Sequence, residues 1–212
     1  MKICIGIISY FPDNDKTRRE RSKKLQNLIN TCTDLFNVPI LIIAQNWIGN
    51  EVALNKLCTV KNFDYPLGIV GARKELRKEF LNSEYDYLIM LDDDCEIYGS
   101  KESAKLYINQ ILNNPGKCGL FNATLLKLFA ISKELFSEVD FGEGSVENGD
   151  FFEDILFVDT LQKKYPNKIF TFRKNGLYER SNNFNDPLST WYHGQFIKRE
   201  IGDRTREIIS KI

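Results

Sequence analysis

The sequence has no excess of one charge, and this absence limits the partners it can have. Its 29 lysines and arginines balance its 29 aspartates and glutamates, so the formal net charge at pH 7 is zero. A general nucleic-acid or membrane-surface binder is expected to be basic overall. These classes are therefore disfavoured, although a local basic patch stays open.

Long apolar runs and paired cysteine motifs are also absent. The longest apolar stretches, residues 3–8 and 38–44, are far shorter than the roughly 20 residues that cross a membrane. No basic-then-apolar leader precedes the first of them. The 5 cysteines form no CxxC motif and no Cys/His cluster, so neither a disulfide framework nor a zinc site is indicated. We therefore expect reduced thiols and a cytoplasmic protein.

Strand-like and helix-like segments alternate along the first half of the chain. Apolar runs predict strands, and apolar residues at helical spacing predict helices. The strands are predicted at residues 2–10, 38–45, 60–63 and 87–91, and the helices at residues 16–36, 68–82 and, more weakly, 50–58. This alternation is typical of a Rossmann-like parallel sheet covered by helices on both faces.

The second half has a different pattern. Two strand-like segments, residues 118–123 and 127–132, are joined by a short link and predict a more antiparallel part. The other elements predicted here are a helix at 101–112, a glycine-rich acidic loop at 141–150, a helix at 151–164, a strand at 168–173 and a final charged helix.

Three adjacent carboxylates, Asp92, Asp93 and Asp94, directly follow the buried strand 87–91. Open α/β sheets bind their ligands at the carboxyl ends of the strands. Adjacent carboxylates repel one another, and a hard cation such as Mg²⁺ or Mn²⁺ takes oxygen ligands of this kind. A solvated acidic turn is the alternative, but the strand context favours a metal-nucleotide site.

Two further acidic or basic features have both a structural and a catalytic interpretation. Glu153 and Asp154 begin a helix, where the helix dipole favours carboxylates, yet a carboxylate beside a nucleotide site could also act as a general base. His193 is the only histidine, and a lone histidine is usually structural, although it could complete a metal site that carboxylates already form.

Two further segments, one with small residues and one with basic residues, also have both a structural and a functional interpretation. Gly68, Gly71 and Arg73 begin the helix before the acidic strand, where they could serve helix packing or let Arg73 meet a phosphate or the carboxylates. A basic run after the first strand, residues 16–24, is interpreted as a solvated helix face or, less readily, as a nucleic-acid contact.

Taken in order, several segments resemble the glycosyltransferases of the GT-A fold, most closely the family-2-like group. The resemblance covers roughly residues 2–195 and rests on IGIISYFPDN, PLGIVGARKELRKEF, LIMLDDDCEIY, FFEDILF and WYH. LIMLDDDCEIY resembles the DxD motif and is the most specific of these segments. Lys74 departs from the family pattern, in which asparagine is more usual. The implied fold is a single α/β GT-A domain over residues 1–212, with a mostly parallel central sheet flanked by helices and a smaller antiparallel C-terminal part.

The resemblance also implies roles for individual residues at the donor site. Asp92 contacts the ribose or the cation, and Asp94 ligates a Mn²⁺ or Mg²⁺ ion with His193 as a further ligand. The other nucleotide-contacting residues that it implies are Ser9, Tyr10, Pro12, Arg73 and Asp93.

At the acceptor side, the resemblance implies that Asp154 deprotonates the acceptor hydroxyl, with Glu153 as its substitute. Residues 142–149 would border the acceptor and order when the donor binds, as active-site lids do. The nucleotide-binding half is then about residues 1–100 and the acceptor-binding half about residues 101–212.

The expected function is metal-dependent transfer of a sugar from a nucleoside-diphosphate sugar, UDP-sugars being the commonest in the group, to a hydroxyl acceptor with inversion. The acceptor stays open among a glycan, a glycolipid, a protein and, because of the basic run, a modified DNA base. One alternative is a nucleotidyltransferase acting on a sugar phosphate, although residues 9–15 hold no glycine for its usual phosphate loop. The other is a non-catalytic nucleotide- or sugar-binding module.

Overall fold

The structure, a computed structural model, describes residues 1–13, 15–48, 52–93, 95–120, 128–142, 153–172 and 178–181. The chain divides into two units, Met1–Glu179 and Arg180–Ile212. The elements below belong to the first unit, apart from the end of the last strand.

The central sheet has 7 strands in the order β3-β2-β1-β4-β7-β6-β8. β1 (Ile3–Tyr10) lies between β2 (Ile40–Gln45) and β4 (Tyr87–Asp92) and pairs in parallel with both. β3 (Cys58–Phe63) extends this parallel part beyond β2. The sequence predicts strands at all four places. The signal is strongest for β1, β2 and β4, because each is a nearly uninterrupted apolar run, as strands buried on both faces require.

The other half of the sheet is mixed. β7 (Leu128–Ser132) runs antiparallel to both of its neighbours, β4 and β6 (Cys118–Leu120). β8 (Ile169–Thr171) follows a short 3-10 helix, Pro166–Lys168, and pairs in parallel with β6. The predicted antiparallel part is therefore confirmed in β6 and β7, while residues 121–127 between them lie outside the described residues.

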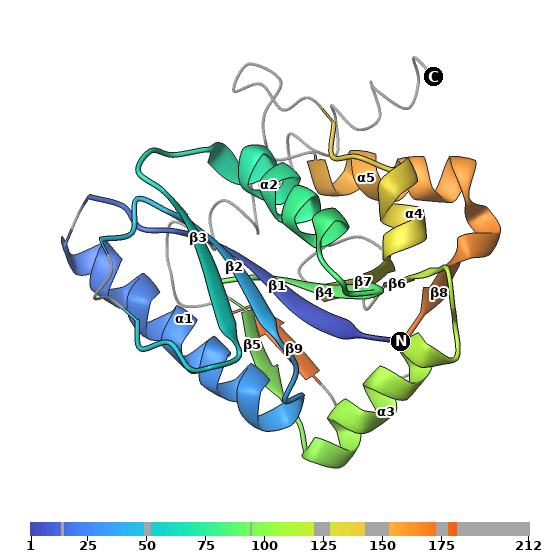
Figure 1. Cartoon of the computed structure of the whole chain (residues 1–212), viewed down its shortest axis with the longest axis horizontal. Coiled ribbons are helices and arrows are strands. Elements are labelled where there is room, and N and C mark those ends of the chain that lie inside the picture. The colour runs from blue at the N-terminus through green and yellow to red at the C-terminus, as the bar shows by residue number, and fades with distance from the viewer. Residues whose placement is uncertain are drawn as a thin grey trace. The chain divides into compact units, whose positions relative to one another are not determined.

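Helices cover both faces of the sheet (Figure 1). α1 (Asp15–Leu35) and α3 (Lys101–Leu112) lie on one face, and α2 (Gly68–Asn82), α4 (Lys133–Glu138) and α5 (Glu153–Lys164) lie on the other. None of the helices in the described part of the chain is both long and apolar enough to cross a membrane. The fold class predicted from the sequence, a mostly parallel α/β sheet flanked by helices, is confirmed.

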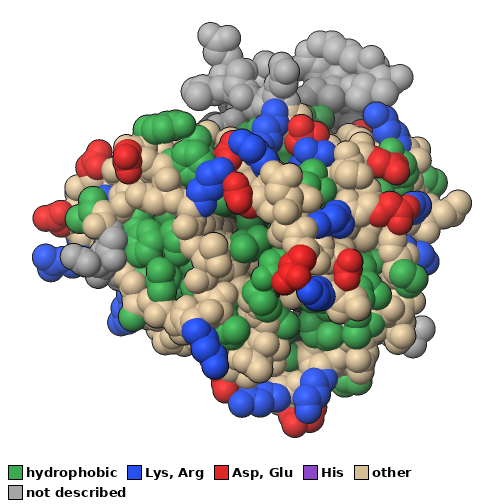
Figure 2. All heavy atoms as spheres, viewed as in Figure 1, with side chains coloured by type: hydrophobic (Ala, Val, Ile, Leu, Met, Phe, Trp, Pro, Cys, Tyr) green, Lys and Arg blue, Asp and Glu red, His purple; other side chains and the backbone are tan. Residues whose placement is uncertain are grey.

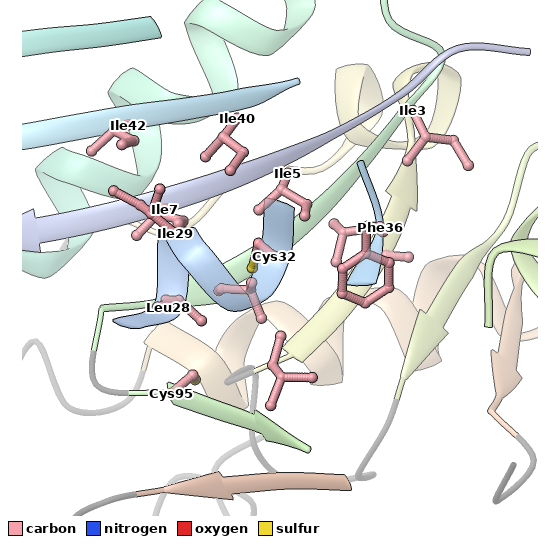
Figure 3. Close-up of a cluster of buried hydrophobic side chains, with 14 of the residues drawn as sticks. Ile3, Ile5, Ile7, Leu28, Ile29, Cys32, Phe36, Ile40, Ile42 and Cys95 are labelled. Atoms are coloured by element: carbon pink, nitrogen blue, oxygen red, sulfur yellow. The ribbon is translucent and has the colours of Figure 1, made fainter. Parts of the chain in front are cut away.

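The alternation of side chains along β1 decides which helix each residue meets. Ile5 and Ile7 point to the α1 face, where they pack with Leu28 and Cys32, as Figure 3 shows. Ile8 belongs to the opposite core, which packs against α2. This two-residue period continues to the strand ends and places polar side chains there on defined faces.

Gly6 lets α2 approach the middle of the sheet. A Cβ atom at this position would lie 2.7 Å from Cδ1 of Leu88 and 2.8 Å from Cδ2 of Leu76, a residue of α2 that is fully buried. Since atoms cannot approach so closely, a larger residue here would force these two buried leucine side chains to shift.

One predicted helix is wrong. Residues 52–57 are not helical, and β3 begins at Cys58. The Asn55 side chain accepts a hydrogen bond from the Leu57 backbone N–H at 2.9 Å and donates to Thr33 Oγ1 at 2.8 Å. Such a local side-chain bond satisfies the backbone in a turn and competes with a helix.

Besides the short 3-10 helix, three described elements were not predicted from the sequence: α4, β5 (Cys95–Tyr98) and β9 (Tyr178–Ser181). The last two form a separate two-stranded sheet. α4 begins where the Ser132 side chain accepts from the Leu135 backbone N–H at 3.2 Å. The sequence signal of this cap is short and directly follows a strand. The predicted final helix lies outside the described residues.

Candidate functional site

The parallel strands end together at one edge of the sheet. Tyr10, the last residue of β1, is paired in register with Gln45, and Gln45 with Phe63, while Asp92 ends β4 beside Ile8. Carboxyl ends of parallel strands are the usual ligand-binding edge of an open α/β sheet. This edge is therefore the candidate site.

Asp92 is held at this edge by a buried arginine. Arg73 of α2 donates from Nη2 to Asp92 Oδ1 at 3.2 Å, and its side chain is 1% exposed whereas that of Asp92 is 17% exposed. The Arg73 guanidinium also lies over the ring of Phe141, 5.7 Å from its centroid. Of the two partners predicted for Arg73, a phosphate or a carboxylate, the structure places it against the carboxylate.

Asp93 points to the opposite face of the sheet. It accepts a hydrogen bond from the Ser9 hydroxyl at 2.7 Å, and Arg21 Nη1 lies 3.0 Å and 3.1 Å from its two carboxylate oxygens. Both Asp93 and Ser9 are buried, at 6% and 2% exposed. Two residues that the sequence predicts to contact the nucleotide thus contact each other.

Arg18 of α1 ties the loop after β1 to the loop after β2. Its Nε donates to the Pro12 carbonyl at 3.3 Å, and its Nη1 and Nη2 donate to the Asn46 carbonyl at 3.0 Å and 2.6 Å. Asn46, which has a positive φ of 60°, donates from Nδ2 to the Phe11 carbonyl at 2.9 Å. The predicted nucleotide residue Pro12 therefore lies in a loop whose backbone is fixed from two sides.

Gln45 fixes the start of α2 at the same edge. Its Oε1 accepts from the Leu67 backbone N–H at 2.6 Å, and Gln45 is 4% exposed. Sequence reasoning missed Gln45 and Asn46, although polar residues that end an apolar strand are a usable signal at a ligand-binding edge.

The candidate base residues begin α5, but the side chains of Glu153 and Asp154 lie outside the described part of the structure. Further along α5, Phe157 stacks on Phe141 with ring centroids 4.5 Å apart and an interplanar angle of 17°. Because Phe141 also lies under Arg73, the packing of α5 is connected to the Asp92 contact.

The predicted metal ligands are not brought together within the described residues. Asp94 and His193 lie outside them. In the part of the chain that is described, no group of three or more His, Cys, Asp or Glu side chains could hold a metal ion. The ligand set of Asp92, Asp94 and His193 stays a prediction.

The basic run divides into residues that the fold uses and residues that face solvent. Arg18 and Arg21 are engaged as described, whereas Lys16, Arg19 and Lys23 are exposed on α1. A shallow hollow of about 410 Å³ lies along α1, lined by Arg18, Arg19, Ser22, Lys23, Gln26 and Asn27. On the face drawn in Figure 2, acidic and basic side chains are interspersed rather than gathered by sign.

No protein-family model matches the sequence, and no curated protein matches it. Solved structures are similar in fold. S. aureus TarS 1–349 in complex with UDP-GlcNAc is 16% identical, with a TM-score of 0.52 over 84% of this chain and 58% of that one. A cytidylyltransferase from Leptospira borgpetersenii serovar Hardjo-bovis is 12% identical, with a TM-score of 0.52 over 83% of this chain and 77% of that one.

The chain has a GT-A-like fold. This finding agrees with the resemblance that the sequence motifs indicate, and it rests on the architecture alone, since the identities are low. The chain spans 58% of the TarS chain and 77% of the cytidylyltransferase chain. GT-A-like neighbours thus include both a protein bound to a nucleotide sugar and a nucleotidyl-transferring enzyme, so the site residues must distinguish the two reactions.

Proposed function

We propose that this protein is a metal-dependent glycosyltransferase that moves a sugar from a nucleoside-diphosphate sugar to a hydroxyl acceptor with inversion. The observation that carries the proposal is the Asp92 carboxylate, which buried Arg73 holds at the carboxyl end of β4. In support, the fold is similar to that of TarS in complex with UDP-GlcNAc, which makes UDP-sugars the first donors to test.

Of the two described aspartates after β4, one fits a hard cation and the other does not. The side chain of Asp92 is 17% exposed and offers carboxylate oxygen, the ligand that Mg²⁺ and Mn²⁺ prefer. Asp93 fits poorly, because its two oxygens are engaged by Ser9 and Arg21. We assign the cation to Asp92, Asp94 and His193, where it would neutralise the diphosphate of the donor.

The chain's own residues would then carry the proton transfer. Asp154 accepts the proton of the acceptor hydroxyl as that oxygen bonds to the anomeric carbon, and the electron pair of the broken bond leaves with the nucleoside diphosphate. Such a base is needed because an alcohol is a poor nucleophile at neutral pH. Glu153 would substitute for it.

Nucleotidyl transfer is the second candidate, favoured by the similarity to the cytidylyltransferase. The two reactions differ in what they release. A glycosyltransferase incubated with a UDP-sugar and an acceptor releases UDP, whereas a nucleotidyltransferase incubated with a nucleoside triphosphate and a sugar phosphate releases pyrophosphate. Release of pyrophosphate alone would overturn the proposal.

The first test is calorimetric titration with a panel of nucleoside diphosphates, each with and without Mn²⁺, repeated on Asp94→Ala. Asp86→Asn is the matched control, because Asp86 lies at the other end of β4, where it accepts a hydrogen bond from the Lys2 backbone N–H at 2.6 Å. We expect Mn²⁺-dependent binding of one nucleotide that Asp94→Ala abolishes and Asp86→Asn retains. If no nucleotide binds with metal present, the glycosyltransferase proposal is refuted.

A further inference from the structure

The two described aspartates after β4 face opposite sides of the sheet, and each has its own arginine. On β4, Leu91 belongs to the core under α1 and Met90 to the core under α2. The same alternation carries Asp92 to the α2 face, where Arg73 meets it, and Asp93 to the α1 face, where Arg21 meets it.

Arg21 is placed by the buried row of α1. Leu25, Leu28 and Cys32 follow it at helical spacing and face the sheet, so Arg21 extends this row by one turn toward the carboxyl edge. Ser9 likewise extends the buried row of Ile5 and Ile7 on β1. The three polar side chains of Ser9, Arg21 and Asp93 therefore meet where both apolar rows end.

The contact between Arg21 and Asp93 has the features of an ion pair that fixes the orientation of the Asp93 side chain. The Asp93 side chain is 8% exposed and that of Arg21 is 39% exposed, and Arg21 Nη1 reaches both oxygens while the Ser9 hydroxyl binds one of them. A buried carboxylate requires such partners, because an unpaired buried charge is strongly unfavourable.

We propose that Arg21 is a positioning residue of the donor site: by pairing with Asp93 it withdraws the middle aspartate from the ligand and fixes the turn that carries its neighbours. The inference rests on the proposed function, since the ligand is the nucleoside diphosphate with its cation. Asp92 is then the described aspartate that faces this ligand, Asp94 keeps the ligand role proposed above, and Asp93 is an anchor. Groups that orient ligating residues in this way affect metal affinity although they touch no metal.

The test measures the dissociation constant of UDP with Mn²⁺ for variants of each aspartate and of Arg21. Asp93→Asn keeps one acceptor oxygen, and in the place of Oδ2 this oxygen can still accept from both Ser9 and Arg21. We therefore expect its dissociation constant to change less than about threefold, whereas Asp92→Asn should weaken binding at least about tenfold. If Asp93→Asn weakens binding as much as Asp92→Asn does, Asp93 is a ligand and the inference is overturned.

For Arg21, the matched control is Leu28→Ala, which lies in the same buried row of α1 but farther from the edge. Arg21→Met should weaken UDP binding by about tenfold or more, and Leu28→Ala should leave it unchanged at a temperature where both are folded. Arg21→Lys, which keeps the charge but not the planar fork, should give an intermediate value. Equal effects of Arg21→Met and Leu28→Ala would mean a purely structural role and overturn the inference.

These outcomes separate the two proposals. If the unaltered chain binds no nucleoside diphosphate with Mn²⁺, the proposed function fails and the positioning role fails with it. Suppose instead that the unaltered chain binds. If Asp93→Asn then weakens binding as much as Asp92→Asn, or Arg21→Met no more than Leu28→Ala, only the positioning role fails.

Discussion

Arg73 and Asp92 form an ion pair at 3.2 Å between the first half of α2 and the last residue of β4, with the arginine side chain 1% exposed. The pair joins a helix on one face of the sheet to the edge at which the parallel strands end. Because Arg73 also lies over Phe141, the pair connects the Asp92 carboxylate at the candidate donor site to a ring that packs against α5. Its removal should therefore affect stability as well as binding.

Replacing Arg73 with methionine should lower the free energy of unfolding by about 3 kcal/mol, because it leaves Asp92 without its buried counter-ion. Lys74→Met, at the next position of α2, is the control and should change stability by less than about 0.5 kcal/mol. Urea unfolding followed by circular dichroism measures both. A loss below about 1 kcal/mol in Arg73→Met would show that the pair is not a main support of this edge.

Arg77, one helical turn after Arg73, holds the end of α4. It donates from Nε to the carbonyls of Phe136 and Val139 at 2.8 Å and 3.0 Å, and from Nη2 to that of Ser137 at 3.0 Å. These carbonyls lie at the helix end, where backbone acceptors have no partner within the helix. Arg77 therefore acts as a C-terminal cap supplied by another helix.

Arg77→Met should reduce the free energy of unfolding by about 2 kcal/mol, since methionine keeps the aliphatic packing but offers no donor to those carbonyls. Lys78→Met is the control, because the Lys78 side chain is 62% exposed and only reaches Glu75, at 3.7 Å. Urea unfolding of both variants tests this, and equal stabilities of the two would contradict the capping role.

The parts of the fold that the sequence predicts are those whose signal is local and long. β1, β2 and β4 are apolar runs, and α1 and α2 repeat their apolar positions over several turns. α4 has only 6 residues, too few to show a period, and the Asn55 turn competes with the weak pattern before β3.

The candidate site was predictable in its location and less so in its contacts. Three acidic residues after a buried strand indicate the edge, but the partner of Asp93 lies 72 residues earlier, within a basic run that resembles a solvated helix face. Only the register of β1 against β4 and the buried row of α1 bring Arg21 to Asp93. Long-range pairing of this kind has no local sequence signal.

Buried thiols should make the protein less stable as the pH rises. Burial raises the pKa of Cys4 to about 12 and also raises the pKa of Cys32 and Cys118. An unfolded thiol has a pKa of about 8.5, so the folded state keeps protons that the unfolded state loses above that pH. The stabilising contribution of Cys4 is thus complete below about pH 8.5 and is lost as the pH rises toward 12.

The free energy of unfolding should accordingly fall between pH 8 and pH 10, which urea titrations at the two values would measure. Cys4→Ala should lose part of this pH dependence, whatever its stability at pH 8.

In the native protein at pH 8, a thiol reagent should modify Cys58 first, because its thiol is half-buried while the other cysteines are buried. Rapid modification of Cys4 or Cys118 in the folded state would contradict this burial.

The assignment of Asp154 as the base predicts that turnover and nucleotide binding respond differently to its loss. Asp154→Asn should lower kcat by roughly 10² to 10⁴-fold, because the asparagine amide cannot accept the acceptor proton, while the dissociation constant for the nucleotide stays unchanged. Asp159→Asn is the control on the same helix, where Asp159 pairs with Lys163 at 3.0 Å. Should Asp154→Asn retain full turnover while Glu153→Gln loses it, the base is Glu153; retention in both variants would require a base outside α5.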